Sequence, residues 1–277
     1  MSRKSSNGLW RAIGISALAS TIVLLAGFGY AVKDMIAPQA STYKGEPAAE
    51  PAPPAEETSL SNSKSITVAA IGDSLTKGTG DSTGEGYVKQ VVALLKSKYS
   101  DIPVRLGNNL ALNGLRADQL AHLLSTDKGY RYALQQANLI IFTIGGNDLF
   151  QIASGGSTNQ SKGDISLEQV KAELPKGIER FKKVVTLIHD INPKAQVVYA
   201  GLYNPFFDLA DMRDGSLQVQ KWNEEAYTIM HQYPNMTMVP TFDLFERTIG
   251  TYLSNDHFHP NHDGYGQIAK RIVQSLE

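Results

Sequence analysis

The sequence predicts an α/β protein with a three-layer α/β/α fold, built on a central, mostly parallel sheet of five strands. Short runs rich in β-branched apolar residues alternate with longer segments whose apolar residues recur at helical spacing. Such alternation produces βαβ crossovers, which leave helices on both faces of a parallel sheet. The chain has 277 residues, of which 42% are hydrophobic, and this is enough to bury one sizeable core.

The N-terminal segment contains an apolar run long enough to cross a membrane. No charged residue lies between Ala12 and Val32, and Arg3, Lys4 and Arg11 precede this run. About 20 helical residues span roughly 30 Å, the hydrocarbon thickness of a bilayer. Preceding basic residues stay in the cytoplasm, so the rest of the chain is expected outside it. We therefore predict a signal anchor over residues 1–36 and a single-pass protein of the cell membrane.

A cleaved signal peptide is the alternative for this segment, and cleavage would make the protein a secreted one. The stretches Gly29-Tyr-Ala31 and Ala37-Pro-Gln-Ala40 loosely resemble sites with small residues around the cut. The apolar run is long for a signal peptide, which favours the anchor. Residues 37–64 are rich in Pro, Ala, Glu and Ser and predict an extended linker without a core.

The folded domain is predicted over residues 65–277, with strands and helices in alternation. Strands are expected where short apolar runs are bounded by Gly, Asn or Pro, over residues 66–71, 103–109, 138–144, 195–200 and 236–240. Helices are expected where apolar residues follow a 3.6-residue period, over residues 87–99, 116–124, 130–137, 178–188 and 265–276. Together these elements predict a flavodoxin-like α/β/α sandwich.

Polar residues follow the predicted strands at the points where the strands end. Ser74 comes after the first strand, Asn113-Gly114 after the second and Asn147-Asp148 after the third. A further group, Asp256-His-Phe-His-Pro260, precedes the last helix. In parallel α/β sheets, ligands bind at the carboxyl ends of the strands. The sequence therefore predicts a functional site at this edge of the sheet.

Four blocks in this order resemble those of the SGNH or GDSL-type serine hydrolases, a family of esterases and lipases. The blocks are Gly72-Asp-Ser-Leu75, Gly114, Gly145-Gly-Asn-Asp148 and Asp256-His-Phe-His259. The resemblance covers the chain from Ser65 to the C-terminus. Each block alone is a weak signal, but all four in the family's order are specific. The resemblance implies a carboxylic ester hydrolase.

The resemblance also implies a role for each matched residue. Ser74 would be the nucleophile, His259 the base and Asp256 the acid of a catalytic triad. The backbone N–H groups of Ser74 and Gly114 and the side-chain amide of Asn147 would donate hydrogen bonds to the oxyanion. The family includes lipases, thioesterases and carbohydrate esterases, so the substrate is a small-molecule, lipid or glycan ester.

The chemistry of these residue types agrees with such roles. A serine hydroxyl needs an adjacent base to become a nucleophile. Histidine suits that task because its pKa lies near neutrality, and a carboxylate fixes its tautomer. Asp256 stands three residues before His259, so one loop could present both. The Gly-x-Ser-x-Gly pentapeptide of the α/β-hydrolase elbow is absent around Ser74.

Each of these residues also has a structural explanation that the sequence leaves open. Ser74 could cap a helix, and Asn147 with Asp148 could cap another. Gly114 could serve a turn that needs a positive φ. Asp73 is expected to hydrogen-bond the backbone of its own loop. A catalytically silent surface-binding module with the same fold is the alternative from another class of function, and a carbohydrate or cell-wall O-acetylesterase is the alternative within the family.

No cofactor and no metal ion are expected. His257 and His262 stand close in sequence to Asp256, His259 and Asp263, a cluster that could hold a metal. However, the chain has no H-E-x-x-H motif and no second cluster to complete the ligands. It has no cysteine, which excludes thiolate sites and disulfides. Its formal net charge is −1, without a basic stripe in the domain, so nucleic acid is not an expected partner.

Three further segments carry expectations about substrate and packing. The loop Gly201–Phe207 could line an acyl pocket, or its phenylalanines could pack beneath the loop. The polar segment Gln151–Gly163 could act as a mobile lid over the site. His189 and His231 lie on predicted helices far from the strand ends and are expected to be surface or packing residues.

Overall fold

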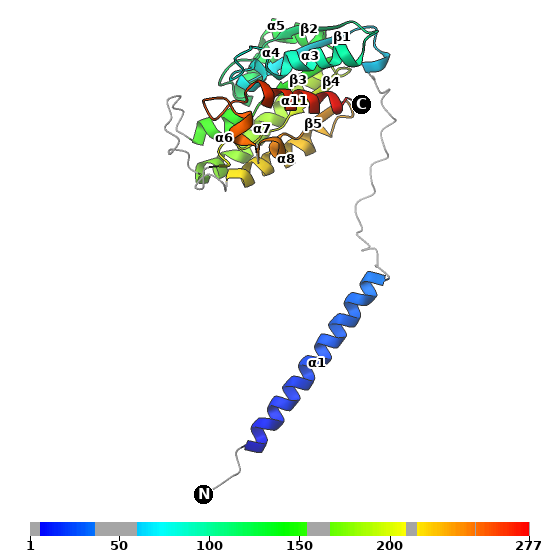
Figure 1. The fold of residues 1–277 in the computed structure, drawn as a ribbon, viewed down its shortest axis with the longest axis vertical. Coiled ribbons are helices and arrows are strands. Elements are labelled where there is room, and N and C mark those ends of the chain that lie inside the picture. The colour runs from blue at the N-terminus through cyan, green and yellow to red at the C-terminus, as the bar shows by residue number, and fades with distance from the viewer. Residues whose placement is uncertain (1–5, 37–59, 154–166, 209–214, 247, 277) are drawn as a thin grey trace. The chain divides into compact units, whose positions relative to one another are not determined.

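The computed structural model describes residues 6–36, 60–153, 167–208, 215–246 and 248–276. It divides the chain into two units, Met1–Pro53 and Pro54–Glu277. The described part of the first unit is one helix, α1 (Ser6–Ile36), shown in dark blue in Figure 1. Within it, Trp10–Tyr30 has a mean hydropathy of 2.0 and buries none of its residues. This helix is long and apolar enough to cross a membrane, a property that signal sequences share.

The second unit contains a five-stranded sheet in the order β2-β1-β3-β4-β5, and all of its strand pairs are parallel (Figure 1). The strands are β1 (Ile66–Gly72), β2 (Val104–Asn109), β3 (Leu139–Thr143), β4 (Gln196–Ala200) and β5 (Met236–Val239). Each lies within one residue of the range expected from the sequence. The order is that of flavodoxin-like sheets, so the predicted three-layer α/β/α fold is confirmed.

Helices connect the strands and cover the sheet. They are α2 (Ser74–Lys77), α3 (Gly86–Lys98), α4 (Ala117–Thr126), α5 (Lys128–Gln135), α6 (Gly146–Ala153), α7 (Leu167–Ile191), α8 (Gly215–Met230), α9 (Phe242–Glu246), α10 (Ile249–Tyr252) and α11 (His262–Gln274), with a short 3₁₀ helix η1 (Leu60–Asn62) before β1. His189 lies on α7 and packs its ring on Tyr233, with 4.3 Å between the ring centroids. His231 directly follows α8.

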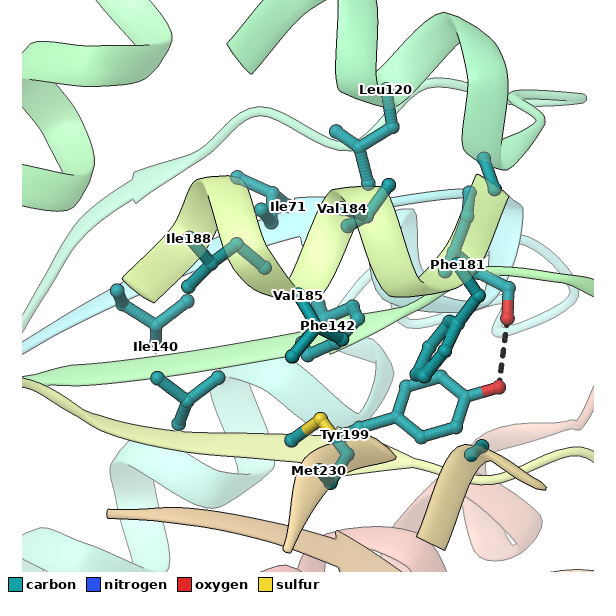
Figure 2. Close-up of a cluster of buried hydrophobic side chains, with 14 of the residues drawn as sticks. Ile71, Leu120, Ile140, Phe142, Phe181, Val184, Val185, Ile188, Tyr199 and Met230 are labelled. Atoms are coloured by element: carbon teal, nitrogen blue, oxygen red, sulfur yellow. Dashed lines mark hydrogen bonds between the residues drawn. The ribbon is translucent and has the colours of Figure 1, made fainter. Parts of the chain in front are cut away.

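The side chains of β1, β3, β4 and β5 alternate between two hydrophobic clusters, one on each face of the sheet. On β1, Ala69 and Ile71 belong to the cluster under α4, α5, α7 and α8, while Val68 and Ala70 belong to the cluster under α3 and α11. Figure 2 shows part of the first cluster, where side chains of α7 pack on side chains of β3 and β4. The α7 residues are Phe181, Val184, Val185 and Ile188, and the strand residues are Ile140, Phe142 and Tyr199. Burial on both faces explains the unbroken apolar runs of the strands.

The strand order places a crevice between the carboxyl ends of β1 and β3. The chain leaves β1 toward β2 on one side and later returns to β3 on the other side, and ligands bind at such reversals. Gly72 at the end of β1 pairs with Thr143 at the end of β3. Ser74 and Asn147 follow these two strand ends, so both lie at the crevice.

Candidate active site

Ser74 is the first residue of α2, and the backbone before it fixes its position. Gly72 has a φ of +124°, and a Cβ there would stand 2.0 Å from the carbonyl oxygen of Thr143, so only glycine fits. Asp73 caps α2, because its carboxylate accepts a hydrogen bond from the N–H of Leu75 at 3.1 Å. The alternative that Ser74 is the cap is therefore wrong. The hydroxyl of Ser74 is not used as the helix cap and can bond another residue.

That partner is His259. The Ser74 hydroxyl lies 2.8 Å from His259 Nε2, and His259 Nδ1 lies 2.6 Å from Asp256 Oδ2. The other carboxylate oxygen, Oδ1, accepts hydrogen bonds from the Ser254 hydroxyl and from the N–H groups of Phe258 and His259. Partial burial raises the pKa of Asp256, but these hydrogen bonds outweigh it and lower the pKa to about 2. An anionic Asp256 keeps the proton on Nδ1, so Nε2 is free to accept one from Ser74.

The residues expected to bind an oxyanion lie around the same crevice. Gly114 has a φ of +73°, as the turn alternative expected, and its N–H points to no acceptor among the described residues. The N–H of Ser74 likewise donates no hydrogen bond within the described part of the chain. Asn147 is the second residue of α6, and its side-chain amide donates to the carbonyl of Leu115 at 3.0 Å. One N–H of that amide remains for a ligand.

Asp148 joins the Asn147 block to the loop that carries Gly114, a contact the sequence analysis missed. Its Oδ2 accepts a hydrogen bond from the N–H of Ala117 at 2.9 Å, and Arg180 lies 3.6 Å from its Oδ1. The residue is only 1% exposed. Burial raises the pKa of Asp148 to about 6, against the opposing effects of Ala117 and Arg180. In the sequence, the position of Asp148 next to Asn147 indicates a role at the site, but a helix cap would explain the same position.

A buried hydrogen-bond network lies beneath Ser74. Thr143 donates to Asp73 Oδ1 at 2.7 Å, and the hydroxyls of Thr143 and Thr76 lie 2.7 Å apart. Thr76 also lies 2.7 Å from the hydroxyl of Tyr87. Burial raises the pKa of Asp73, while the hydrogen bonds from Thr143 and Leu75 act against this. The network ties α2 to β3 and α3, and it confirms that Asp73 bonds the backbone of its own loop.

A cavity of about 20 Å³ is lined by residues from three of the four blocks, those that contain Ser74, Asn147 and His259. Leu75, Gly146 and Phe258 contribute to it, and the rest of its wall comes from Thr143, Ala200, Gly201, Leu202, Tyr203, Pro205, Thr241 and Ile268. The hydroxyls in this wall are already paired: Thr143 with Asp73, Thr241 with the Gly201 carbonyl and Tyr203 with the Phe258 carbonyl. The cavity is therefore apolar in character.

The loop after β4 contributes residues both to the wall of the cavity and to the packing beneath the loop. Gly201 to Tyr203 and Pro205 line the cavity, whereas Phe206 is buried and packs on Phe258 with 5.9 Å between the ring centroids. The predicted lid falls on residues 151–163, of which 154–163 lie outside the described residues.

The His- and Asp-rich segment does not form a metal cluster in the described part of the chain. His257 is exposed and has a φ of +53°. His262 faces Asp81, with 3.3 Å between Nδ1 and Oδ2. His257 and His262 therefore form no group of potential metal ligands with His259 among the described residues.

Comparison with known proteins identifies the family. The model of the GDSL-like Lipase/Acylhydrolase family matches residues 70–267. The uncharacterized protein YpmR of Bacillus subtilis (strain 168) is 34% identical over 215 residues, which cover 76% of this chain and 82% of that protein.

Solved structures share the fold. The lipase Lip_vut3 from a goat rumen metagenome has a TM-score of 0.65 at 23% identity, covering 77% of this chain and all of that chain (100%). The family 3 carbohydrate esterase of Clostridium thermocellum has a TM-score of 0.55 at 16% identity, covering 77% of this chain and 98% of that one. At these identities the likeness concerns the fold. The family match and the 34% identical relative together show that the chain belongs to the GDSL-like lipase/acylhydrolase family of carboxylic ester hydrolases.

Proposed function

We propose that this chain is a membrane-tethered serine esterase that acts through Ser74, His259 and Asp256. The observation that carries the proposal is the unbroken series of contacts from Asp256 Oδ2 to His259 Nδ1, at 2.6 Å, and from His259 Nε2 to the Ser74 hydroxyl, at 2.8 Å. A serine with an adjacent base, which is in turn oriented by a carboxylate, is the arrangement that activates a hydroxyl nucleophile.

In the first half of the reaction, Ser74 Oγ attacks the carbonyl carbon of the ester while His259 Nε2 takes the hydroxyl proton. The carbonyl oxygen becomes an oxyanion, which the N–H groups of Ser74 and Gly114 and the amide of Asn147 stabilise. The carbonyl then re-forms, the bond to the alcohol oxygen breaks, and His259 gives its proton to the departing alcohol. Asp256 remains an anion throughout and stabilises the imidazolium.

In the second half, water takes the place of the alcohol. His259 removes a proton from the water, and the resulting hydroxide attacks the acyl carbon bound to Ser74. The same donors stabilise the second oxyanion. When the bond between the acyl carbon and Ser74 Oγ breaks, His259 returns the proton to Oγ, and the carboxylic acid leaves.

A p-nitrophenyl acetate burst assay tests this function against the catalytically silent binding module. An acyl-enzyme mechanism predicts a rapid release of one chromophore per protein molecule, followed by slower turnover. A fluorophosphonate probe should then attach to Ser74, identified by the mass of the peptide that contains it. A protein that gives neither burst nor label is the binding module.

The apolar cavity beside the three blocks favours a short acyl group. Its wall includes Leu75, Gly146 and Phe258, the chain neighbours of Ser74, Asn147 and His259. We infer that the acyl chain attached to Ser74 enters this apolar space. At about 20 Å³ the cavity has room for roughly one group of the size of water, which suits the methyl group of an acetyl ester. This favours acetate esters, including those of carbohydrates.

Chain-length preference is therefore expected to follow the size of this cavity. The kcat/KM for p-nitrophenyl esters should fall by about 10-fold or more for butyrate relative to acetate, because a chain that outgrows its pocket loses binding in the transition state. Gly146→Ala should sharpen the preference, since the new Cβ meets only Leu202 Cδ2 at 4.0 Å and takes space from the cavity. Leu202→Ala should enlarge the cavity and raise the butyrate-to-acetate ratio by about 10-fold.

Leu217→Ala is the matched control for Leu202→Ala, because Leu217 lies on α8, is 53% exposed and does not line the cavity. It should keep the wild-type profile. The assignment of the acyl site to this cavity is contradicted if Gly146→Ala and Leu202→Ala both keep that profile too.

The helix α1 would hold the esterase on the outer side of the membrane. Its apolar stretch Trp10–Tyr30 is 21 residues long, and basic residues precede it. We further propose that residues 1–36 anchor the protein, residues 37–64 form a linker and residues 65–277 form the hydrolase. Leu60 is already buried in the core of the second unit, so a shortened chain should begin before it.

The full-length chain is expected in the membrane fraction of cells, because its apolar helix partitions into the bilayer. Protease added outside intact cells should degrade the hydrolase domain. A chain that begins at Pro54 should be soluble and should keep its esterase activity. Recovery of a secreted protein that begins near Met35 or Ser41 would instead identify the segment as a cleaved signal peptide.

A further inference from the structure

The loop that carries His259 has its own internal hydrogen bonds. Leu253 and Pro260 form an isolated antiparallel bridge, and the N–H of Ser254 donates to the carbonyl of His259 at 2.8 Å. These contacts shape the loop, but they join residues of one segment to each other. They do not fix the distance between His259 and Ser74, which belong to segments 185 residues apart.

Besides the hydrogen bond from the Tyr265 hydroxyl to the Thr79 carbonyl, at 2.6 Å, the two segments are joined by Asp81 and His262. The loop between α2 and α3 packs closely against His259 at Gly80. A Cβ added to Gly80 would stand 2.7 Å from the Cβ of His259 and 2.6 Å from the Pro260 carbonyl, so there is no room for a side chain. The next residue, Asp81, points its Oδ2 at Nδ1 of His262, at 3.3 Å. His262 is the first residue of α11 and stands three residues after His259.

The Asp81 carboxylate is built into the protein. Its side chain is completely buried, at 0% exposed. Oδ1 accepts from the N–H and the hydroxyl of Thr83, both at 2.8 Å, and Oδ2 accepts from the N–H of Gly86 at 2.9 Å. Burial raises the pKa of Asp81, but the hydrogen bonds from Thr83, Gly86 and His262 outweigh it and hold the pKa below its usual value. A charged carboxylate therefore faces His262.

The proton arrangement at His262 follows from Thr83. The Thr83 hydroxyl gives its only proton to Asp81 Oδ1, and the same oxygen lies 3.1 Å from His262 Nδ1. Thr83 can therefore only accept from that nitrogen, so Nδ1 carries a proton. This N–H is shared between Thr83 Oγ1 and Asp81 Oδ2. Gln90 adds a bond to the same residue, from its Nε2 to the His262 carbonyl at 3.1 Å.

We propose that Asp81 and His262 are positioning residues, which hold the loop of His259 at the distance that proton transfer from Ser74 requires. The inference rests on the proposed role of His259 as the base. The imidazole of His262 and the carboxylate of Asp81 take no part in the chemistry. They join the start of α11 to the α2–α3 loop, at a point three residues after His259 on one segment and seven residues after Ser74 on the other. Misplacement of a catalytic group by about 1 Å can cost about 100-fold in rate.

Two substitutions at His262 test this positioning role. His262→Leu keeps the bulk but removes the Nδ1–H, and it should lower kcat by about 10-fold or more with KM changed less than about 2-fold. His262→Asn places an amide N–H near the position of Nδ1 and should keep kcat within about 3-fold of wild type. Rates are measured well below the melting temperature of each variant. They are divided by the concentration of active sites, titrated with a fluorophosphonate, so that unfolded molecules do not lower the measured kcat.

Asp81→Asn should lower kcat as His262→Leu does, because an amide cannot accept from all the donors around it. The double variant should lose no more than the stronger single variant, since both changes break the same contact between Asp81 and His262. Glu85→Gln is the control: its carboxylate is 51% exposed and only within 4.0 Å of His262 Nδ1, so activity should stay within about 2-fold.

The proposal is overturned if His262→Leu keeps wild-type kcat, or if His262→Asn loses as much as His262→Leu. It is also overturned if the effects of Asp81→Asn and His262→Leu multiply. Failure of the proposed function would be seen separately, as full activity of a variant that lacks the Ser74 hydroxyl.

Discussion

Ser74→Ala is expected to abolish ester hydrolysis and to leave the fold nearly intact. The change removes the atom that attacks the ester, and no other hydroxyl lies beside His259 Nε2 in the described contacts. The rate should fall by about 1,000-fold or more. Stability should change little, because among the described residues the Ser74 hydroxyl bonds only His259, and His259 keeps its hydrogen bond to Asp256. Hydrolysis of p-nitrophenyl acetate and a thermal melt measure both effects.

Ser100→Ala is a matched control for this experiment, because Ser100 is an exposed serine after α3 that belongs to none of the four blocks. It should hydrolyse the ester at the wild-type rate and take up the fluorophosphonate label. The Ser74 variant should take up none. A Ser74→Ala protein with more than a tenth of the wild-type activity would remove Ser74 from the role of nucleophile, while membership of the family would stand.

The sheet could be predicted because four of its five strands, all but the edge strand β2, are largely buried on both faces. All five residues of β3, Leu139–Thr143, are buried, so the sequence shows an unbroken apolar run that ends at a glycine. The polar blocks could be found for a related reason: a polar residue directly after such a run must lie at the carboxyl edge of the sheet. Ser74 and Asn147 meet this condition at neighbouring strands.

The contacts that support the site could not be predicted in the same way. Asp148 reaches Ala117 across 31 residues, and Asp81 reaches His262 across 181. No periodicity links such pairs, because their approach depends on the order of the strands and on the packing of whole loops. Asp81 reads as an ordinary turn residue in the sequence. The network of Thr76, Thr143 and Tyr87 is hidden for the same reason.

Asn147→Ala is expected to lower kcat by about 100-fold or more with little change in KM. If the second N–H of the Asn147 amide donates to the oxyanion, its contribution arises only as negative charge develops in the transition state. Loss of one such donor typically costs about 3–4 kcal/mol of transition-state stabilisation. The first N–H donates to the Leu115 carbonyl, so the variant should also lose about 1 kcal/mol of folding free energy. Steady-state kinetics and a melting curve separate the two losses.

Asn147→Asp distinguishes the oxyanion role from a purely structural role in α6. Asn147 stands in the first turn of this helix, where a carboxylate interacts favourably with the helix dipole, so aspartate should support the helix at least as well as asparagine. A structural role therefore predicts an active enzyme. The oxyanion role predicts a nearly inactive one, because aspartate cannot donate and adds a negative charge beside the developing oxyanion. An active Asn147→Asp enzyme would leave the N–H groups of Ser74 and Gly114 as the only donors of the proposed oxyanion hole. An inactive one that melts near the wild-type temperature would assign the amide of Asn147 to the transition state.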